Sequence, residues 1–298
     1  MGFTNKKSKE RSHLFLNMRK STIVLTSSVT LLLLAGHHYF FLKDATSLQG
    51  SAKKGTTLKK TSLLHEVSTN TEFHTQGQTE EIKLAKGKVS IDPTTSVPYI
   101  HCGVVYSGKN GKKPKELLLL HGAKYNKETW VQSNILPSFC NLDPTLSVIA
   151  VDLPVRANGE ELTKLFSGLK KAKKISGEPL AIVSPSASGK SVLDLLDLST
   201  TDTHAVTQII RGWIPVACGS ITHASDHVLR QVNTLHIPTL AIYGSLDKTG
   251  KVVSEKLKDA GKAYVNVMGL NGGHPVYLDD TSRFINYVSM FINSKIYG

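Results

Sequence analysis

Three residues of the kinds used in acyl-transfer chemistry occur along the chain in the order serine, aspartate, histidine. Ser186 follows an apolar run and precedes a helix-forming segment, Asp247 ends a β-rich segment, and His274 lies in a glycine-containing loop after another such segment. A serine hydroxyl becomes nucleophilic when an imidazole removes its proton, and a carboxylate orients and stabilises that imidazole. The sequence therefore predicts Ser186 as nucleophile, His274 as base and Asp247 as the acid of a catalytic triad.

The segment around Ser186 has the pattern of a nucleophile elbow, in which a sharp turn between a strand and a helix exposes a serine. The usual pattern is G-x-S-x-G, and here Ser184 and Ser188 stand in place of both glycines. Glycine is common at these positions because the turn is strained and close to neighbouring backbone. The substitutions make the turn unusual in detail, but its small residues remain compatible with an elbow.

A second segment predicts where the oxyanion of an acyl-transfer intermediate would be held. The apolar run 117–120 leads directly into His121-Gly122-Ala123. In hydrolases with a nucleophile elbow, one oxyanion-hole amide follows the nucleophile and the other comes from the loop after an earlier strand. We therefore expect the backbone amides of Ala187 and Ala123 to form the oxyanion hole.

The residues Ser-Ala-Ser-Gly-Lys-Ser also permit another interpretation, a phosphate-binding loop of the form G-x-x-x-x-G-K-[ST] with Ser184 replacing the first glycine. Such loops usually follow the first strand of their domain, whereas at least two strand-like segments precede this one. Pro185 would also remove an amide from a loop that binds phosphate through its amides. A phosphate loop leaves Asp247 and His274 unexplained, so the elbow is favoured, with Lys190 exposed early in the following helix.

The elements that must position these residues alternate between strands and helices. We expect strands near residues 117, 146, 180, 209, 237 and 264, separated by helix-compatible stretches. This alternation predicts an α/β fold, a mainly parallel sheet flanked by helices. The short span between Val216 and Ile237 leaves little room for a lid, which favours an open pocket and a small acyl group.

In this order, several segments resemble the small α/β-hydrolase domain-containing protein 14 group, and especially its membrane-anchored member. They are Leu-Leu-Leu-Leu-His-Gly, Asp152-Leu-Pro, Ser184-Pro-Ser-Ala-Ser-Gly, Trp213-Ile-Pro-Val-Ala, Tyr243-Gly-Ser-Leu-Asp and Gly273-His-Pro-Val-Tyr-Leu. The resemblance covers roughly residues 81 to 296 and implies the α/β-hydrolase fold with Ser186, Asp247 and His274 as the triad. The chain departs from the group after Asp152-Leu-Pro, where it has Val155 and Arg156 instead of glycines.

Two classes of function follow from this pattern. The first is a serine hydrolase, or an acyl transferase, that acts on small acyl esters, thioesters or amides through an acyl-enzyme on Ser186. The second is a noncatalytic module with a hydrolase fold that serves in protein interaction, which the substituted elbow permits. Neither needs a cofactor or a metal, and the sequence does not identify protein partners.

The amino-terminal region differs in composition from the rest. Residues 1–20 are basic, residues 21–42 contain no formally charged side chain, and residues 43–80 are rich in Ser, Thr, Lys and Gln. Twenty-two helical residues would span about 33 Å, enough for a hydrocarbon core of about 30 Å. With the basic flank in the cytoplasm, this predicts a cytoplasmic tail, a type II signal anchor, a flexible stalk and a lumenal or extracellular hydrolase domain at 81–296. A cleaved signal peptide, giving a secreted form, and a cytoplasmic protein are the alternatives.

The chain has a formal net charge of +13, to which the tail and the predicted stalk contribute strongly. A basic chain can bind nucleic acid, but no paired Cys/His zinc pattern or other nucleic-acid motif is present. We expect no specific nucleic-acid partner, and a membrane contact made through the amino-terminal segment.

Other reactive residues have plainer interpretations. Cys102, Cys140 and Cys218 are too few for a disulfide framework, and we expect them to be buried as small hydrophobic residues. His223 and His227 are four apart, but no third ligand completes a metal site.

Three further histidines and one further acid stand out in the sequence. His65, His74 and His101 are isolated and are expected to face solvent. Asp152 also follows a strand and is an alternative triad acid, although Asp247 has the favoured position between serine and histidine.

Overall fold

A single sheet organises the part of the chain that the computed structural model describes, namely residues 83–103, 114–199 and 202–298. Within these residues the sheet has eight strands in the order β1-β2-β4-β3-β5-β6-β7-β8. Their bounds are β1 Ala85–Ser90, β2 Ser96–Cys102, β3 Lys115–Leu119, β4 Leu146–Val151, β5 Leu180–Pro185, β6 Ile210–Val216, β7 Thr239–Gly244 and β8 Val265–Leu270. Strands β3 to β8 pair in parallel, whereas β2 is antiparallel to both β1 and β4. The predicted mainly parallel sheet is confirmed.

The six strands expected from the sequence correspond to β3 through β8, and the hairpin of β1 and β2 was not predicted. Every residue of β4 and of β5 is buried, because helices cover both faces of a parallel sheet, and such strands form continuous apolar runs. Strand β1 is mostly exposed and carries Lys86 and Lys88, and β2 contains Pro98. Neither has the apolar run that marks an interior strand.

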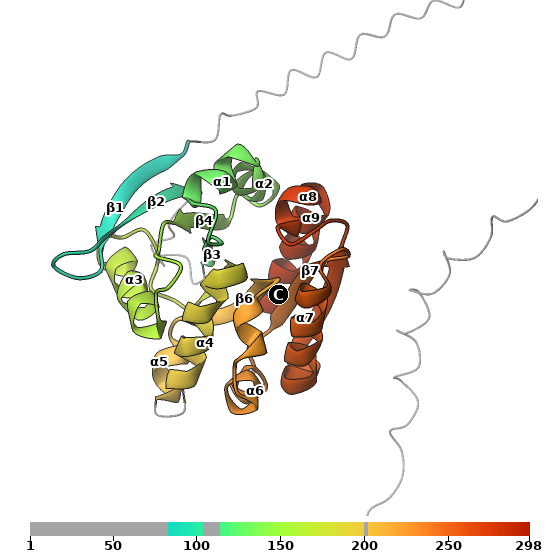
Figure 1. Cartoon of the computed structure of the whole chain (residues 1–298). Helices are drawn as coiled ribbons and strands as arrows, with labels where there is room; N and C mark the ends of the chain where they lie inside the picture. The colour runs from blue at the N-terminus through green and yellow to red at the C-terminus, as the bar shows by residue number, and fades with distance from the viewer. Residues whose placement is uncertain (1–82, 104–113, 200–201) are drawn as a thin grey trace, which may run out of the picture. The chain divides into compact units, whose positions relative to one another are not determined.

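Helices cover the sheet in two layers (Figure 1). One layer packs in a cluster with Leu118, Ile182 and Trp213, and the other in a cluster with Leu117, Val183 and Ile214. The first layer contains α3 Gly159–Lys171, α4 Gly189–Leu198, α5 Thr203–Thr207, α6 Asp226–Thr234 and α7 Lys248–Gly261. The second contains α1 Lys127–Gln132, α2 Ile135–Leu142, α8 Val276–Asp279, α9 Thr281–Phe291 and the closing turn η4 Ile292–Ile296. Three short turns, η1 Ser186–Ser188, η2 Gly219–Thr222 and η3 Lys262–Tyr264, complete the described elements.

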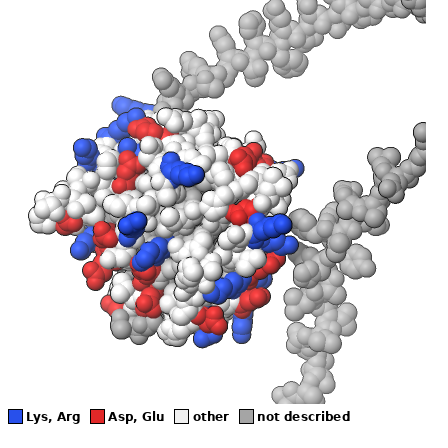
Figure 2. Space-filling model, in the orientation of Figure 1, with Lys and Arg blue, Asp and Glu red and all other residues white. Residues whose placement is uncertain are grey.

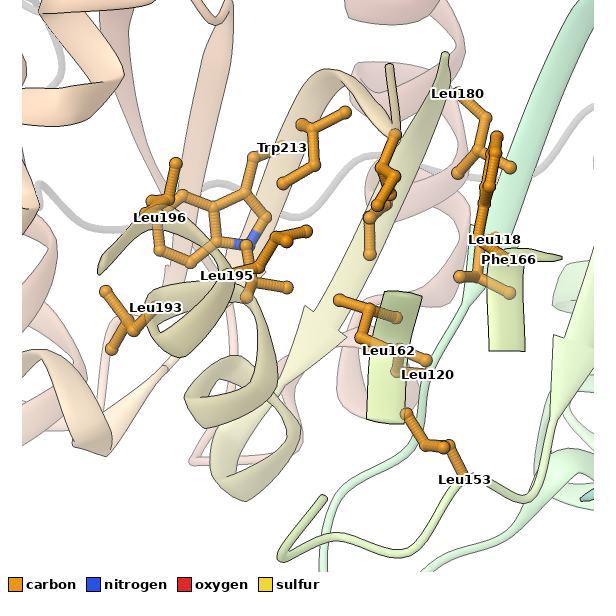
Figure 3. Packing of buried hydrophobic residues seen from close by; sticks show 14 of the residues in the cluster. Leu118, Leu120, Leu153, Leu162, Phe166, Leu180, Leu193, Leu195, Leu196 and Trp213 are labelled. Atoms are coloured by element: carbon orange, nitrogen blue, oxygen red, sulfur yellow. The ribbon is translucent and has the colours of Figure 1, made fainter. Parts of the chain in front are cut away.

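The packing of α4 on the sheet fixes the helix that follows the predicted nucleophile. Figure 3 shows the indole of Trp213, from β6, beside leucines of α4, and Leu195 and Leu196 are fully buried there. The indole N–H donates to Ser184 Oγ in β5 at 2.8 Å, so the large ring is buried with its polar atom paired. Truncating such a buried aromatic side chain typically costs about 3–5 kcal/mol. These contacts hold α4 against the sheet and tie Ser184, two residues before Ser186, to β6.

An aromatic cluster in the other layer joins the helices beside His274. The Trp130 ring of α1 stacks on the Tyr277 ring of α8, with centroids 4.8 Å apart, and Phe284 of α9 lies 6.0 Å from Tyr277. The Trp130 N–H donates to the carbonyl of Leu120 at 3.1 Å, at the end of β3. Helix α8 begins two residues after His274, so this cluster ties the histidine loop to the sheet.

The expectation that all three cysteines act as separate buried residues is wrong for two of them. Cys102 at the end of β2 and Cys140 in α2 form a disulfide with their Cα atoms 6.4 Å apart, and Cys218 remains a free buried thiol. The two partners are 38 residues apart in the sequence, and they meet because β2 pairs with β4 while α2 packs against the same strand. Their separation in the sequence carries no sign of this pairing.

The predicted cytoplasmic tail, signal anchor and stalk, residues 1–80, lie outside the described residues. In the part of the chain that is described, no helix has the length and apolar character to cross a bilayer. Figure 2 shows basic and acidic side chains interspersed over the visible face. That face carries no continuous basic strip of the kind that binds nucleic acid, and the absence of a nucleic-acid partner stays a prediction.

Candidate active site

Ser186 directly follows β5 and begins the short turn η1, which leads into α4, and this is the structural context that the sequence motif requires. Its backbone φ is +52°, in the left-handed region that residues other than glycine seldom adopt. Strain of this kind costs on the order of 1–3 kcal/mol and recurs at functional sites. The turn therefore has the conformation expected of a nucleophile elbow.

The two serines that replace the usual glycines are both accommodated by hydrogen bonds. Ser184 is fully buried and accepts the Trp213 N–H, and Ser188 Oγ donates to the carbonyl of Pro185 at 2.9 Å. A glycine is required instead at position 189, where a Cβ would overlap Cys218 Sγ. The turn thus keeps its tight packing with a different distribution of small residues.

The three predicted triad residues meet at one edge of the sheet. His274 Nε2 lies 2.8 Å from Ser186 Oγ, and His274 Nδ1 lies 2.7 Å from Asp247 Oδ2. Because the carboxylate accepts only, the network assigns the proton to Nδ1, which leaves Nε2 free to accept the Ser186 hydroxyl proton. The side chain of Asp247 is 10% exposed and that of His274 is 52% exposed. The acid is thus shielded, while the imidazole remains accessible to a substrate or a water molecule.

Asp247 is held independently of the histidine. It precedes α7, and its Oδ1 accepts the amide of Gly250 at 2.9 Å, so the carboxylate also caps the helix. A glycine is needed at 250 because a Cβ there would lie 2.5 Å from Asp247 Oδ2. These contacts orient one oxygen to the helix and the other to His274.

The loop that carries His274 is anchored by two acids that were not predicted from the sequence. Asp279 Oδ2 accepts the amide of Gly273 at 2.7 Å, and Asp280 Oδ2 accepts the amide of Asn271 at 3.1 Å. The Leu246 amide, beside Asp247, donates to the carbonyl of Gly272 at 2.9 Å. The acid loop and the histidine loop are therefore joined directly. The one clue in the sequence is the pair of adjacent acids shortly after the histidine.

The His121-Gly122-Ala123 loop lies against the elbow. A Cβ added to Gly122 would be 3.7 Å from Ser186 Cβ. His121 Nδ1 lies 3.0 Å from the Gly122 carbonyl and can donate to it, which orients the peptide unit whose N–H belongs to Ala123. Among the described residues, the Ala123 amide donates no backbone hydrogen bond. Ala187 is in the first turn of η1, where helical amides lack intrahelical acceptors. Both predicted oxyanion amides are thus in loops or turns next to Ser186.

Asp152, the alternative triad acid, binds Lys127 and does not contact His274. Its two carboxylate oxygens accept the backbone amide and the ammonium of Lys127, each at 2.7 Å. His121 Nε2 lies 4.0 Å away. The carboxylate that contacts His274 is that of Asp247, as the chain order predicted.

A cavity of about 380 Å³ opens beside Ser186 and His274. Its other walls include the side chains of Tyr125, Val216 and Tyr277. The connection from β6 to β7 contains η2 and α6 without any larger insertion over the cavity. Two larger surface cavities, of about 440 and 450 Å³, contain none of these site residues.

Several other residues singled out in the sequence lie away from this site. His101 was expected to face solvent, but it is buried in β2, its Nε2 lies 2.9 Å from Ser147 Oγ, and burial and the Lys174 charge lower its pKa. His65 and His74 lie outside the described residues. Lys190 pairs with Asp194 one turn along α4.

The two histidines considered as metal ligands belong to different elements of the fold. His223 follows η2, whereas His227 lies in α6. Over residues 83–103, 114–199 and 202–298, no group of three or more His, Cys, Asp or Glu side chains could hold a metal ion.

Comparison of the sequence with known proteins finds similar chains of one kind. The chain is 30% identical over 174 residues to rat “Putative protein-lysine deacylase ABHD14B”, a match that covers 55% of this chain and 76% of that protein. The human form is 27% identical over 181 residues, covering 57% and 79%. Rat “Protein ABHD14A” is 27% identical over 177 residues, covering 57% and 68%. No family model matches the chain.

Solved structures support the fold. A predicted CIB-like hydrolase from Thermoplasma acidophilum matches with a TM-score of 0.53 and 17% identity, over 71% of this chain and 99% of that one. Dienelactone hydrolase from Anabaena variabilis matches with a TM-score of 0.52 and 12% identity, over 71% and 97%. At these identities the likeness concerns the fold alone, which is that of an α/β-hydrolase.

Proposed function

Because the chain belongs to the α/β-hydrolase domain-containing protein 14 family, we propose that it is a serine hydrolase that forms an acyl-enzyme on Ser186. The observation that carries the proposal is the hydrogen-bond chain from Ser186 through His274 to Asp247, at 2.8 and 2.7 Å. Nucleophile, base and orienting acid lie within the distances at which such groups transfer a proton.

In the acylation step, Ser186 Oγ attacks the carbonyl carbon of the substrate while His274 Nε2 takes the hydroxyl proton. The imidazolium that forms is stabilised by the Asp247 carboxylate, which stays ionised. The negative charge on the carbonyl oxygen is stabilised by the amides of Ala123 and Ala187. When the tetrahedral intermediate collapses, His274 returns the proton to the leaving group, and the acyl group remains on Ser186.

In the deacylation step, a water molecule gives its proton to His274 Nε2 and attacks the acyl carbon. The C–O bond to Ser186 then breaks, the serine regains its proton from the imidazolium, and a carboxylic acid leaves. The exposure of His274 allows water to reach it. Another nucleophile in the place of water would give acyl transfer.

The substrate range we propose is small acyl esters, thioesters or amides. It is supported by the modest cavity beside Ser186, about 380 Å³, and by the short β6–β7 connection. The name of ABHD14B refers to acyl groups on protein lysine, and such amides fall within this range. The reaction needs no cofactor, and we propose none.

We also propose that the hydrolase domain lies in the lumen or outside the cell, anchored as a single-pass type II membrane protein. The composition of residues 1–42 supports the anchor, with a basic segment preceding an uncharged one. The Cys102–Cys140 disulfide independently supports an oxidising compartment, because structural disulfides are rare in the cytosol.

A fluorophosphonate probe, which reacts with activated serines, tests the catalytic proposal. We expect the wild-type protein to be labelled on Ser186, as located by mass spectrometry. Ser186→Ala and His274→Ala should not be labelled, whereas Asp152→Ala should retain labelling because its carboxylate does not contact His274. A folded wild-type protein that is never labelled would instead indicate a noncatalytic module.

A further inference from the structure

The cavity beside Ser186 has an uneven distribution of charge. Among the described residues that line it, Lys124 is the one with a permanent charge at neutral pH, and the other walls are aromatic, aliphatic or backbone. Of the other titratable residues there, His274 belongs to the catalytic chain, and Tyr125 and Tyr277 are phenols. Burial and the neighbouring Tyr125 raise the pKa of Tyr277 above its ordinary value.

The Lys124 ammonium has no carboxylate partner among the described residues, and Lys124 is an exposed residue that lines the cavity. Lys127, one turn further on, is different, because Asp152 binds it at 2.7 Å and Glu128 lies 3.8 Å away. Asp247, the acid of the triad, is shielded from solvent and hydrogen-bonded to His274 and to the Gly250 amide. The positive charge of Lys124 is therefore available to a bound molecule.

We propose that Lys124 selects substrates that carry an anionic group, a carboxylate or a phosphate, near the acyl bond that is cleaved. This inference rests on the proposed function of the same site. Lys124 directly follows Ala123, whose amide would hold the oxyanion, so the ammonium extends from the backbone that contacts the reacting carbonyl. An anion beside that carbonyl completes an ion pair that the free protein lacks.

The anion can belong to the acyl group or to the leaving group, and two pairs of substrates distinguish these sources. Mono-4-nitrophenyl glutarate and 4-nitrophenyl pentanoate have acyl chains of equal length that end in a carboxylate or a methyl group. The 3-carboxy-4-nitrophenyl and 4-nitrophenyl esters of butyrate differ by a carboxylate on the leaving group. For each pair, the ratio of kcat/KM for the anionic to the neutral ester is measured after subtraction of each ester's rate without enzyme, which for the glutarate includes attack by its own carboxylate.

In Lys124→Gln we expect the ratio for one pair to fall about five-fold, and in Lys124→Glu to fall further, because an exposed ion pair contributes up to roughly 1 kcal/mol. Added salt should reduce the same ratio in the wild type. Lys164→Gln is the matched control, since it removes an equal charge from an exposed position on α3 outside the cavity. Equal ratios in wild type and both Lys124 variants, for both pairs, would overturn the proposal.

A binding measurement separates this proposal from the proposed catalysis. The variant Ser186→Ala cannot form an acyl-enzyme, so calorimetric titration can measure how tightly it binds the anionic and the neutral ester of a pair. The pair used is the one whose kcat/KM ratio falls in Lys124→Gln. If the protein shows no turnover, both pairs are titrated. We expect the anionic ester to bind more tightly, and Lys124→Gln to remove about a five-fold preference. Absence of turnover with this preference intact would contradict only the catalytic proposal. Turnover without any preference for the anion would contradict only the role of Lys124.

Discussion

The Cys102–Cys140 disulfide allows a quantitative prediction of stability, because it closes a long loop between β2 and α2. The partners are 38 residues apart. In the chain-entropy treatment, closing a loop of that length lowers the entropy of the unfolded chain by about 13 cal/mol/K, or about 4 kcal/mol at 25 °C. Reducing the disulfide should therefore lower the free energy of unfolding by about 4 kcal/mol, a large part of the 5–15 kcal/mol typical of a domain.

Urea denaturation of the protein with and without reductant measures this difference by linear extrapolation. The double variant Cys102→Ala/Cys140→Ala should be less stable than the oxidised protein and should not respond to reductant. Cys218→Ala is the matched control, because Cys218 is also buried but unpaired. It should lose about 1 kcal/mol through the missing sulfur atom and should keep the full response to reductant.

Two results would refute this reasoning. One is alkylation of all three cysteines when the protein is unfolded in denaturant without reductant. The other is an unfolding free energy that changes by less than about 1 kcal/mol on reduction. The first result would also remove the structural support for an oxidising compartment, leaving only the composition of the amino-terminal segment.

Two further predictions concern the histidine loop and the buried histidine. Asp279→Ala should lower kcat/KM for ester hydrolysis by about 10²-fold, because it releases the Gly273 amide next to His274, and a displacement of about 1 Å costs that much. Asp279→Asn, which keeps an acceptor oxygen, should restore part of the rate; equal rates for wild type and Asp279→Ala would contradict the anchoring role. Burial lowers the pKa of His101 from 6.5, so the unfolded chain binds more protons than the folded protein as the pH falls through that value. The unfolding free energy should therefore decrease from pH 7 to pH 5, by at most about 1.4 kcal/mol per pH unit from this residue, and urea titrations of His101→Gln should show a shallower decrease. An identical pH dependence in that variant would exclude His101 as a cause.

The interior strands could be predicted because a strand that is buried on both faces consists of a continuous run of apolar residues. Leu117 to Leu120 and the all-buried strands β4 and β5 are examples. Strand β1 pairs only with β2 at the edge of the sheet, so most of its residues face solvent and its composition resembles that of a loop. Its pairing depends on a neighbour, which its own residues do not specify.

The convergence of Ser186, Asp247 and His274 could be predicted for a related reason. Each follows the carboxyl end of a strand, β5, β7 and β8 respectively, and parallel strands place these ends along one edge of the sheet. The order of the residues therefore carries information about their position in space. The anchoring of the His274 loop by Asp279 and the pairing of Asp152 with Lys127 depend on contacts between loops, and no strand pattern encodes those contacts.

Ser184 shows that a sequence motif alone does not indicate which substitutions the fold can accommodate. In isolation, replacement of the first glycine of G-x-S-x-G looks like damage to the elbow. In the fold, Ser184 Oγ accepts the N–H of Trp213, whose ring fills the space between β6 and α4. A glycine at 184 would leave that N–H buried without an acceptor, which costs about 1–3 kcal/mol. Ser184 and Trp213 therefore form one unit, and the second glycine's packing role has moved to Gly189, against Cys218. The elbow is retained because the tertiary contacts changed together with the motif.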